Sequence, residues 1–286
     1  MFEEMKVGKL DLLNALKNIY VLSALALVFG YFISSALVTQ PQVGIIKISG
    51  AITTKGTADD VVRMLRYARN TSEIKAVVLE INSPGGEVTV TEEIYLNILD
   101  LRKEKPVVAS INQIGASGAY YISVASNYII AKPSSSIGSI GVVSSLPSPV
   151  KLDEDEIITG PFKQTGSSRK DYTYDVQLAQ ETFLNAVLLQ RGKRLQITKE
   201  ELARAEIYSG IEGKRLGLID EIGSNTDAIE KAADLARIAN YQEVDINENL
   251  GIQSFFIHIT YVNESILETP SNTVPVNYYL YLEMVK

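Results

Sequence analysis

The chain has 286 residues, of which 46% are hydrophobic and 21% are charged, a composition that is ordinary for a globular protein and excludes a disordered one. The net charge is −7, and Lys and Arg form no block, so no nucleic-acid partner is expected. There is no cysteine, which excludes disulfides, thiolate metal sites and cysteine nucleophiles. The single histidine, His258, cannot supply a His-rich metal site, and we expect neither a metal ion nor another cofactor.

An uncharged apolar run covers residues 19–38. A helix rises 1.5 Å per residue, so about twenty residues cross the roughly 30 Å hydrocarbon core of a bilayer. We therefore expect an uncleaved transmembrane anchor at residues 19–39. A buried core helix would usually be shorter and interrupted by polar positions. A cleaved signal peptide would have a shorter apolar core and fewer residues before it.

The lysines around this run are distributed unevenly. Three precede it and one follows it closely: Lys6, Lys9, Lys17 and then Lys47. Because segments rich in Lys and Arg remain in the cytoplasm, the bias predicts a single-pass protein of the cell membrane. Residues 1–18 are then cytoplasmic, and the bulk of the chain is extracytoplasmic.

Short apolar strands alternate with amphipathic stretches from residue 42 to about residue 240. Strands are predicted at residues 43–48, 75–81 and 106–111, each rich in β-branched side chains. Helical spacing predicts helices at residues 57–70, 90–103, 117–127, 174–192, 199–204 and 227–239. Strands and helices that alternate over short connections predict one α/β domain with a mainly parallel sheet.

The C-terminal extension, residues 241–286, indicates no clear role. Its apolar segment at 255–262 is too short to span a membrane, so we expect a buried or interface strand in which His258 is packed. Three tyrosines near the end suit either a protomer interface or a lipid contact: Tyr278, Tyr279 and Tyr281.

Two glycine-bearing turns each follow an apolar strand and precede a helix. The first is Asn-Ser-Pro-Gly-Gly at 82–86, where paired glycines permit positive φ and the close approach of another chain; by itself it indicates only a turn. The second, Gly-Ala-Ser-Gly-Ala at 115–119, puts the Ser117 hydroxyl at the start of a helix with free N–H groups. That hydroxyl is either a nucleophile beside amides that stabilise an oxyanion, or simply an N-cap.

A serine nucleophile needs a base, and His258 lies far along the chain in an apolar segment. A lysine base is a known variant of the triad arrangement. A free lysine has a pKa of about 10.4, so keeping it neutral at pH 7 costs about 4.6 kcal/mol, and a working lysine must be desolvated. Lys163 fits best, because it lies beside Phe162 between glycines and without nearby acids. An ordinary loop lysine is the alternative.

Five motifs occur in one order between residues 43 and 223. They are Asn-Ser-Pro-Gly-Gly, Ala-Ser-Gly-Ala-Tyr-Tyr-Ile-Ser, Gly-Ser-Ile-Gly-Val, Thr-Gly-x-x-Lys and Gly-Lys-Arg-Leu-Gly-Leu-Ile-Asp-Glu-Ile-Gly. This order resembles the signal peptide peptidase A family, also called protease IV. The resemblance implies a ClpP/crotonase-like α/β fold with a mainly parallel sheet for residues 42–240. It also implies a ring-shaped homo-oligomer with active sites facing an inner chamber, completed in some members by a neighbouring protomer.

The resemblance also implies roles for individual residues. Ser117 matches the nucleophile and Lys163 the general base, and Ser139 matches the serine that holds the lysine amine by a hydrogen bond. The backbone N–H groups of Gly86 and Gly118 would form the oxyanion hole. The implied function is a membrane-anchored serine endopeptidase, a Ser-Lys dyad hydrolase that degrades remnant signal peptides or other membrane-derived peptides.

The chain departs from the family pattern around the lysine. Gln164 and then Ser167-Ser168 stand where the family usually has an acidic or amide residue followed by Ser-Pro. The stretch between residues 143 and 159 is shortened and carries four acidic residues at 153–156. The dyad is intact, but the shape of this loop does not follow from the family.

Three other functions remain open. A membrane-bound ClpP-class protease of the NfeD-associated type shares the Ser-Lys chemistry, although the Ala-Ser-Gly-Ala-Tyr-Tyr motif favours protease IV. Acyl-CoA chemistry of the crotonase type would use the two amides but has no use for Ser117. A non-enzymatic membrane scaffold would not need Ser117, Ser139 and Lys163 together.

Overall fold

The computed structural model describes residues 17–30, 39–145, 159–252 and 277–280, and the chain divides into two compact units, Met1–Gln40 and Pro41–Lys286. The described part of the first unit is a helix over residues 17–30. Among the described residues, no helix is both long enough and apolar enough to cross a membrane. The rest of the apolar run, residues 31–38, lies outside the described residues.

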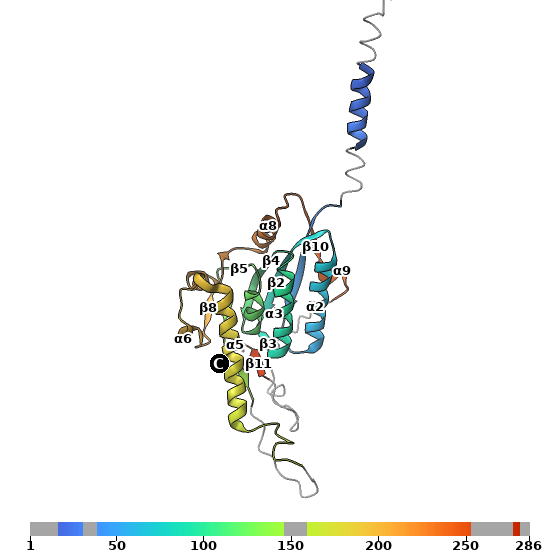
Figure 1. The fold of residues 1–286 in the computed structure, drawn as a ribbon. Helices are drawn as coiled ribbons and strands as arrows, with labels where there is room; N and C mark the ends of the chain where they lie inside the picture. The colour runs from blue at the N-terminus through green and yellow to red at the C-terminus, as the bar shows by residue number, and fades with distance from the viewer. Residues whose placement is uncertain (1–16, 31–38, 146–158, 253–276, 281–286) are drawn as a thin grey trace, which may run out of the picture. The chain divides into compact units, whose positions relative to one another are not determined.

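The second unit is built around one mostly parallel sheet (Figure 1). Its strands are β1 (Gln42–Ser49), β2 (Ile74–Ser83), β4 (Val107–Ala116), β5 (Tyr128–Ala131), β6 (Ser136–Gly138), β8 (Ile207–Ser209), β9 (Glu221–Ile222) and β10 (Gln242–Asp245). The order along the sheet is β10-β1-β2-β4-β5-β9, and every neighbouring pair in it is parallel. Strand β6 pairs parallel with the end of β4, and β8 pairs antiparallel with β6.

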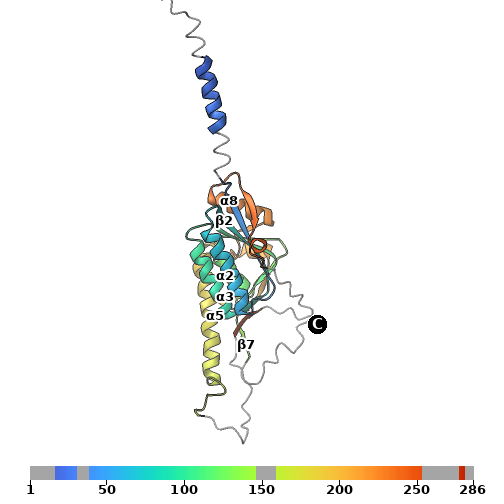
Figure 2. The same cartoon turned by 90° about the vertical axis from the view of Figure 1, so that its right-hand side faces the viewer.

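Helices cover both faces of this sheet (Figures 1 and 2). They are α2 (Lys55–Asn70), α3 (Val88–Leu101), α4 (Gly118–Val124), α5 (Arg169–Arg191), α6 (Lys199–Leu202), α7 (Gly210–Arg215), α8 (Asn225–Ala236) and α9 (Ile246–Asn249), with a 3₁₀ turn η1 at Gly192–Arg194. Helices α2 to α5 pack in sequence, α2 on α3, α3 on α4 and α4 on α5. Helix α8 covers the opposite face over β1, β2 and β4.

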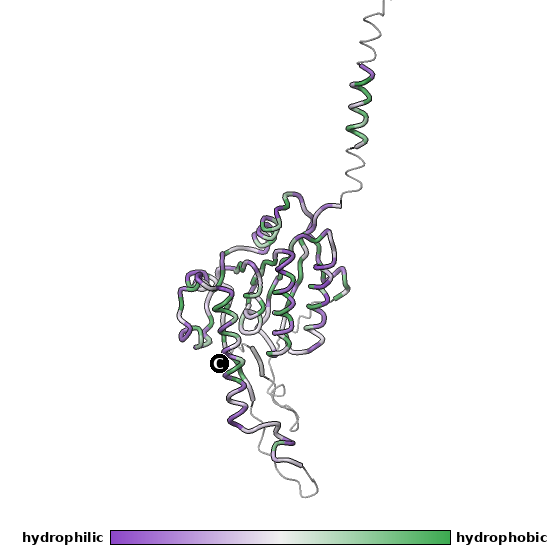
Figure 3. Tube along the Cα trace, viewed as in Figure 1, coloured by the Kyte–Doolittle hydropathy of each residue, from purple (hydrophilic) through white to green (hydrophobic). Residues whose placement is uncertain are grey.

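Burial on both faces explains why the central strands are almost continuously apolar (Figure 3). In β2, Val77 and Leu79 belong to the larger core beneath α2 to α5. Ala76 and Val78 point to the other side and belong to the smaller core beneath α8. The period-2 alternation of a strand therefore divides consecutive apolar residues between two cores.

A second, antiparallel sheet lies beside the first. Its strands are β3 (Gly85–Glu87), β7 (Val143–Ser144) and β11 (Asn277–Leu280), in the order β3-β11-β7. Strand β11 comes from the end of the chain and also contacts helices α3 and α4. This small sheet joins the loop after β2, the segment after β6 and the C-terminal segment.

The predicted strands and long helices are present, with their ends shifted by a few residues. The short strands β5 to β9 were not predicted. The predicted peptidase domain ends at residue 240, whereas the main sheet continues to β10, on the far side of β1. The predicted strand at 255–262 with His258 lies outside the described residues, as does Tyr281.

Candidate active site

Ser117 stands at the junction between β4 and α4. Its backbone angles, φ 53° and ψ −125°, are rare for a residue with a side chain and typically cost about 1–3 kcal/mol. Its side chain makes no capping hydrogen bond to α4. Ser117 thus occupies the N-cap position of α4, but its hydroxyl sits on a strained turn and does not cap the helix.

Backbone pairing between neighbouring strands maintains this strained turn. Ala116, the last residue of β4, pairs with Gly138, the last residue of β6. The Ser117 N–H then donates to the Gly138 carbonyl over 2.7 Å. The end of β6 thus fixes the end of β4, and the backbone conformation at Ser117 is determined by this strand pairing and not by a hydrogen bond of its hydroxyl.

Ser139 follows directly on the carbonyl that binds Ser117. Its φ is also positive, 54°, and its N–H donates to the Glu206 carbonyl over 2.8 Å. Gly138 before it has φ 97°, and a Cβ there would lie 2.8 Å from the same Glu206 oxygen, so only glycine fits. The structure thus brings Ser139 to the end of the strand next to Ser117.

Gly86 lies in β3, in contact with the loop before α2. A Cβ at this position would be 1.9 Å from the Ile52 carbonyl oxygen, so the close approach of two backbones requires glycine. The flanking groups make this contact: the Ile52 N–H donates to the Gly85 carbonyl and the Glu87 N–H to the Ile52 carbonyl. Successive groups along a strand alternate in direction, so the N–H and C=O of Gly86 point to the opposite edge.

The turn before Gly86 is shaped by its own serine. The Gly85 N–H donates to the Ser83 hydroxyl over 3.1 Å, and Gly85 has φ 105°. This contact explains the serine and the first glycine of the Asn-Ser-Pro-Gly-Gly motif, because Ser83 and Gly85 together set the backbone direction at the start of β3.

Gly118 is the first residue of α4, so its N–H has no partner within the helix. Helix α4 contacts β3, and no hydrogen bond in the described residues uses the N–H of Gly118. Two backbone amides, of Gly86 and Gly118, therefore stand on contacting elements next to the Ser117 turn. Backbone N–H groups in such a position can stabilise an oxyanion.

Lys163 is not brought to Ser117. It lies exposed in a series of turns over residues 159–167, next to Phe162, which is 48% exposed. In the described part of the chain its amine forms no hydrogen bond or ion pair. Among the described residues, Lys163 and the neighbouring Phe162 are exposed, so the apolar pocket expected around the amine is not formed by that part of the chain.

Two acidic side chains lie near the start of α3. Glu87 caps this helix through a 2.7 Å hydrogen bond from the Val90 N–H. Burial, and secondarily the charge of Glu87, raises the pKa of Glu92. No group of three His, Asp or Glu side chains gathers as metal ligands would in the described residues.

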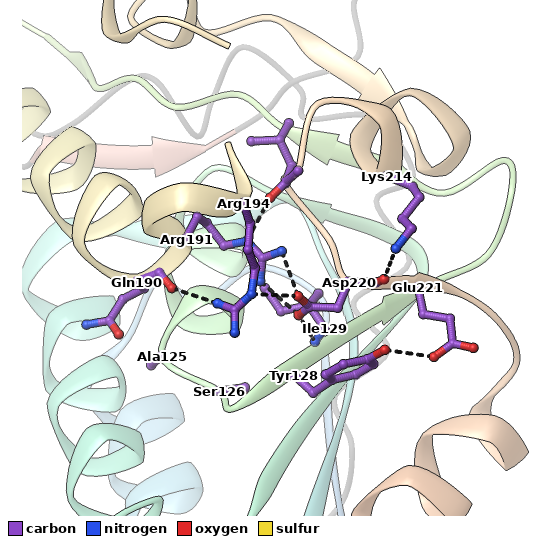
Figure 4. A network of polar contacts seen from close by, with 12 residues as sticks. Ala125, Ser126, Tyr128, Ile129, Gln190, Arg191, Arg194, Lys214, Asp220 and Glu221 are labelled. Carbon is purple, nitrogen blue, oxygen red and sulfur yellow. Dashed lines mark hydrogen bonds and ion pairs between the residues drawn. The ribbon is translucent and has the colours of Figure 1, made fainter. Parts of the chain in front are cut away.

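The last family motif has a structural rather than a chemical role (Figure 4). Asp220 forms a bidentate ion pair with Arg191 of α5, at 2.8 and 2.9 Å, and both side chains are buried. Asp220 also accepts the Ile129 N–H over 2.8 Å, while Arg191 donates to the Gly217 carbonyl. This network fastens the long helix to β5.

Two backbone groups that shape the site could not be predicted from the sequence. The Gly138 carbonyl holds Ser117, and the Ile52 carbonyl demands Gly86. Every residue has a backbone carbonyl, so the residue type does not indicate which carbonyl will make a contact. Gly138 itself, however, is part of the Gly-Ser-Ile-Gly-Val motif.

Two family models match this chain. That of peptidase family S49 matches residues 100–239, and that of Clp protease matches residues 33–144. The putative protease MJ0651 of Methanocaldococcus jannaschii is 31% identical over 70% of this chain and 69% of its own length. The chain belongs to peptidase family S49.

Other S49 relatives carry protease names. Protease 4 of Salmonella typhi is 30% identical over 74% of this chain, and the chloroplastic serine protease SPPA of Arabidopsis thaliana is 29% identical over 71%. This chain spans only 38% and 32% of their lengths. The 1510-N membrane-bound stomatin-specific protease is similar with a TM-score of 0.48 and 19% identity, over 68% of this chain and 81% of that one.

The S49 membership makes this chain a serine peptidase with a ClpP-like α/β fold and a mostly parallel, mixed sheet. A peptidase acts on peptides, so peptide substrates are implied.

Proposed function

We propose that this S49 peptidase is a membrane-anchored endopeptidase that uses a Ser-Lys dyad, with Ser117 as nucleophile and Lys163 as general base. The observation that carries the proposal is the Ser117 turn. Ser117 has a strained backbone, and its hydroxyl does not cap its own helix, near the amides of Gly86 and Gly118. Strain of this kind is found at functional sites.

The reaction would be acyl transfer. Neutral Lys163 accepts the proton of Ser117 while Oγ attacks the peptide carbonyl, and the amides of Gly86 and Gly118 hold the oxyanion. The resulting ammonium protonates the leaving amine as the C–N bond breaks. Water then attacks the acyl-serine with Lys163 again as base, which releases the carboxylic acid and restores the serine.

Lys163 must lose its contact with water to act in this way. Its exposed position in the single chain supports a site that is completed on assembly. We infer a ring-shaped homo-oligomer in which the segment at 159–167 is covered and its lysine is brought to a Ser117, with Ser139 holding the amine.

The apolar run at 19–38 supports a single-pass anchor in the cell membrane, with residues 1–18 cytoplasmic and the peptidase unit extracytoplasmic. An anchored site works close to the bilayer. Remnant signal peptides and other membrane-derived peptides are therefore the proposed substrates.

The test is hydrolysis of a fluorogenic peptide by the purified full chain. Ser117→Ala and Lys163→Ala should each lower kcat by at least about 10⁴-fold, as loss of a nucleophile or its base does in other serine peptidases. Lys170→Ala, which removes an exposed lysine at the start of α5, should leave kcat unchanged. Full activity in Lys163→Ala would assign the base to another residue, and full activity in Ser117→Ala would refute the dyad.

A further inference from the structure

We propose that the turn at residues 203–206, between α6 and β8, is a positioning element of the active site. It holds the turn at Ser139, and through it the turn at Ser117, in the geometry that the reaction needs. The proposal rests on the proposed function, because it takes Ser117 as the nucleophile and Ser139 as the residue that holds the lysine amine. The turn itself takes no part in making or breaking a bond.

This turn contacts the Gly-Ser-Ile-Gly segment around Ser139 at three points. The Ser139 N–H donates to the Glu206 carbonyl over 2.8 Å. A Cβ at Gly138 would lie 2.8 Å from that carbonyl oxygen, and a Cβ at Gly141 would lie 2.8 Å from the Cβ of Ala205. Both glycines of the segment therefore lie tightly against the turn, one before Ser139 and one after it.

An unusual backbone conformation recurs along this line of contacts. Ser117, Ser139 and Ala205 have positive φ angles of 53°, 54° and 55°, and among the described non-glycine residues only Arg237 shares this feature. The N–H of the first donates to the carbonyl that precedes the second, and the N–H of the second to the carbonyl that follows the third. Strain of this kind persists only where the surrounding contacts maintain it, and it is concentrated at functional sites.

The turn has its own supports in the peptidase unit. The Gln180 side chain of α5 donates to the Ala203 carbonyl over 3.1 Å. Strand β8, which follows the turn, pairs antiparallel with β6. Because the turn is held from both ends, it can act as a fixed support for Ser139. A displacement of the turn is passed to Ser139 and then to Ser117 through two backbone hydrogen bonds.

The contact between Gly141 and Ala205 allows such a displacement to be made and then reversed. Among the described residues, the Ala205 Cβ is the one atom beyond its chain neighbours that a Cβ at Gly141 would meet within 4 Å. The φ of Gly141 lies outside the left-handed region, so its backbone accepts alanine. Ala205→Gly removes the opposing methyl at a positive φ that glycine adopts readily. The two substitutions together move one methyl group across the contact.

The experiment compares Gly141→Ala, Ala205→Gly and the double variant in the full chain, with the fluorogenic peptide as substrate. We expect Gly141→Ala to lower kcat about tenfold, because a nucleophile displaced by about 1 Å can lose about 10²-fold in rate, while KM changes less than about twofold. Ala205→Gly is the reference for a double-mutant cycle, in which the double variant should recover at least about fivefold of the loss. Gly56→Ala, at the exposed start of α2, is the matched control and should change neither constant.

An unchanged kcat in Gly141→Ala would overturn the proposal. A double variant as slow as Gly141→Ala would also overturn it, because the loss would then not act through the turn. Amide hydrogen exchange of the same full chains gives a readout besides activity. The segment at residues 136–142 should exchange faster in Gly141→Ala and at the wild-type rate in the double variant.

The exchange measurement also separates this proposal from the proposed function. If no chain cleaves the peptide, the wild type included, the proposed peptidase mechanism fails and the exchange rates alone test the turn. Recovery of slow exchange in the double variant then supports the positioning element. Equal exchange in all the chains overturns it.

Discussion

At the scale of single residues, the family motifs separate into two groups with different physical roles. Ser117 has a strained backbone and a hydroxyl that caps no helix, and it lies near the amides of Gly86 and Gly118, which is why this group points to chemistry. Asp220 is different, because its carboxylate is buried and fully paired with Arg191 and the Ile129 N–H. A motif residue of that kind stabilises the fold.

Replacement of Arg191 tests this role. Arg191→Met removes one partner of a buried pair and leaves the Asp220 charge buried, which should cost about 3–5 kcal/mol of unfolding free energy. Arg194→Met is the matched control, since Arg194 contacts the same carboxylate at 3.3 Å but its side chain is 54% exposed, and it should cost less than about 1 kcal/mol. Urea unfolding of both variants gives the comparison, and equal losses would contradict the structural role.

At the scale of elements, helix α3 carries a partly buried carboxyl group, that of Glu92, close to a second acidic residue. The pKa of Glu92 is raised because the side chain is half-buried and lies near Glu87. A carboxylate whose folded pKa lies above its unfolded value supports the fold at low pH, and that support is lost as the pH rises through the folded pKa.

Glu92→Gln should therefore stabilise the protein at pH 7, because burial disfavours the charged carboxylate, and have little effect on Tm below about pH 4, where an unfolded glutamate is protonated. Thermal unfolding at several pH values measures the difference. Glu93→Gln on the same helix is the control and should shift Tm little at any pH, because Glu93 is exposed and a glutamine still accepts from Asn97. A destabilised Glu92→Gln at pH 7 would contradict the assignment.

At the scale of the whole molecule, the end of the main sheet is made by residues beyond the predicted domain boundary. Strand β10 pairs with β1, and Asn247 exchanges two hydrogen bonds with the backbone of Lys47. Ile246 is fully buried beside Gly44. Strands about two hundred residues apart in the sequence, β1 and β10, thus complete one edge of the sheet.

A chain of residues 42–240 should accordingly be less stable than a chain of residues 42–252. The burial of Ile246 contributes about 1.5–3 kcal/mol and the Asn247 contacts about 1–3 kcal/mol, so the shorter chain should lose roughly 3 kcal/mol or more. Denaturant midpoints of the two chains measure the loss. Identical midpoints would show that the edge contributes nothing.

Residue patterns alone indicated the α/β class, the central strands and the long helices, because alternation of apolar residues reports burial directly. They also indicated which turns carry unusual residues, since glycines at 86 and 138 are demanded by local backbone contacts. The short strands β5 to β9 escaped notice because two to four residues carry too little periodicity to be distinguished from loops.

Only the tertiary structure decided which residues meet. That Ser139 lies beside Ser117 follows from the pairing of β6 with β4, and that the C-terminal strand lies against Gly86 follows from pairing across almost two hundred residues of sequence. Both depend on backbone hydrogen bonds, which every residue type except proline can make. Motif order therefore indicated the family, while sheet pairing determined which of the motif residues lie together.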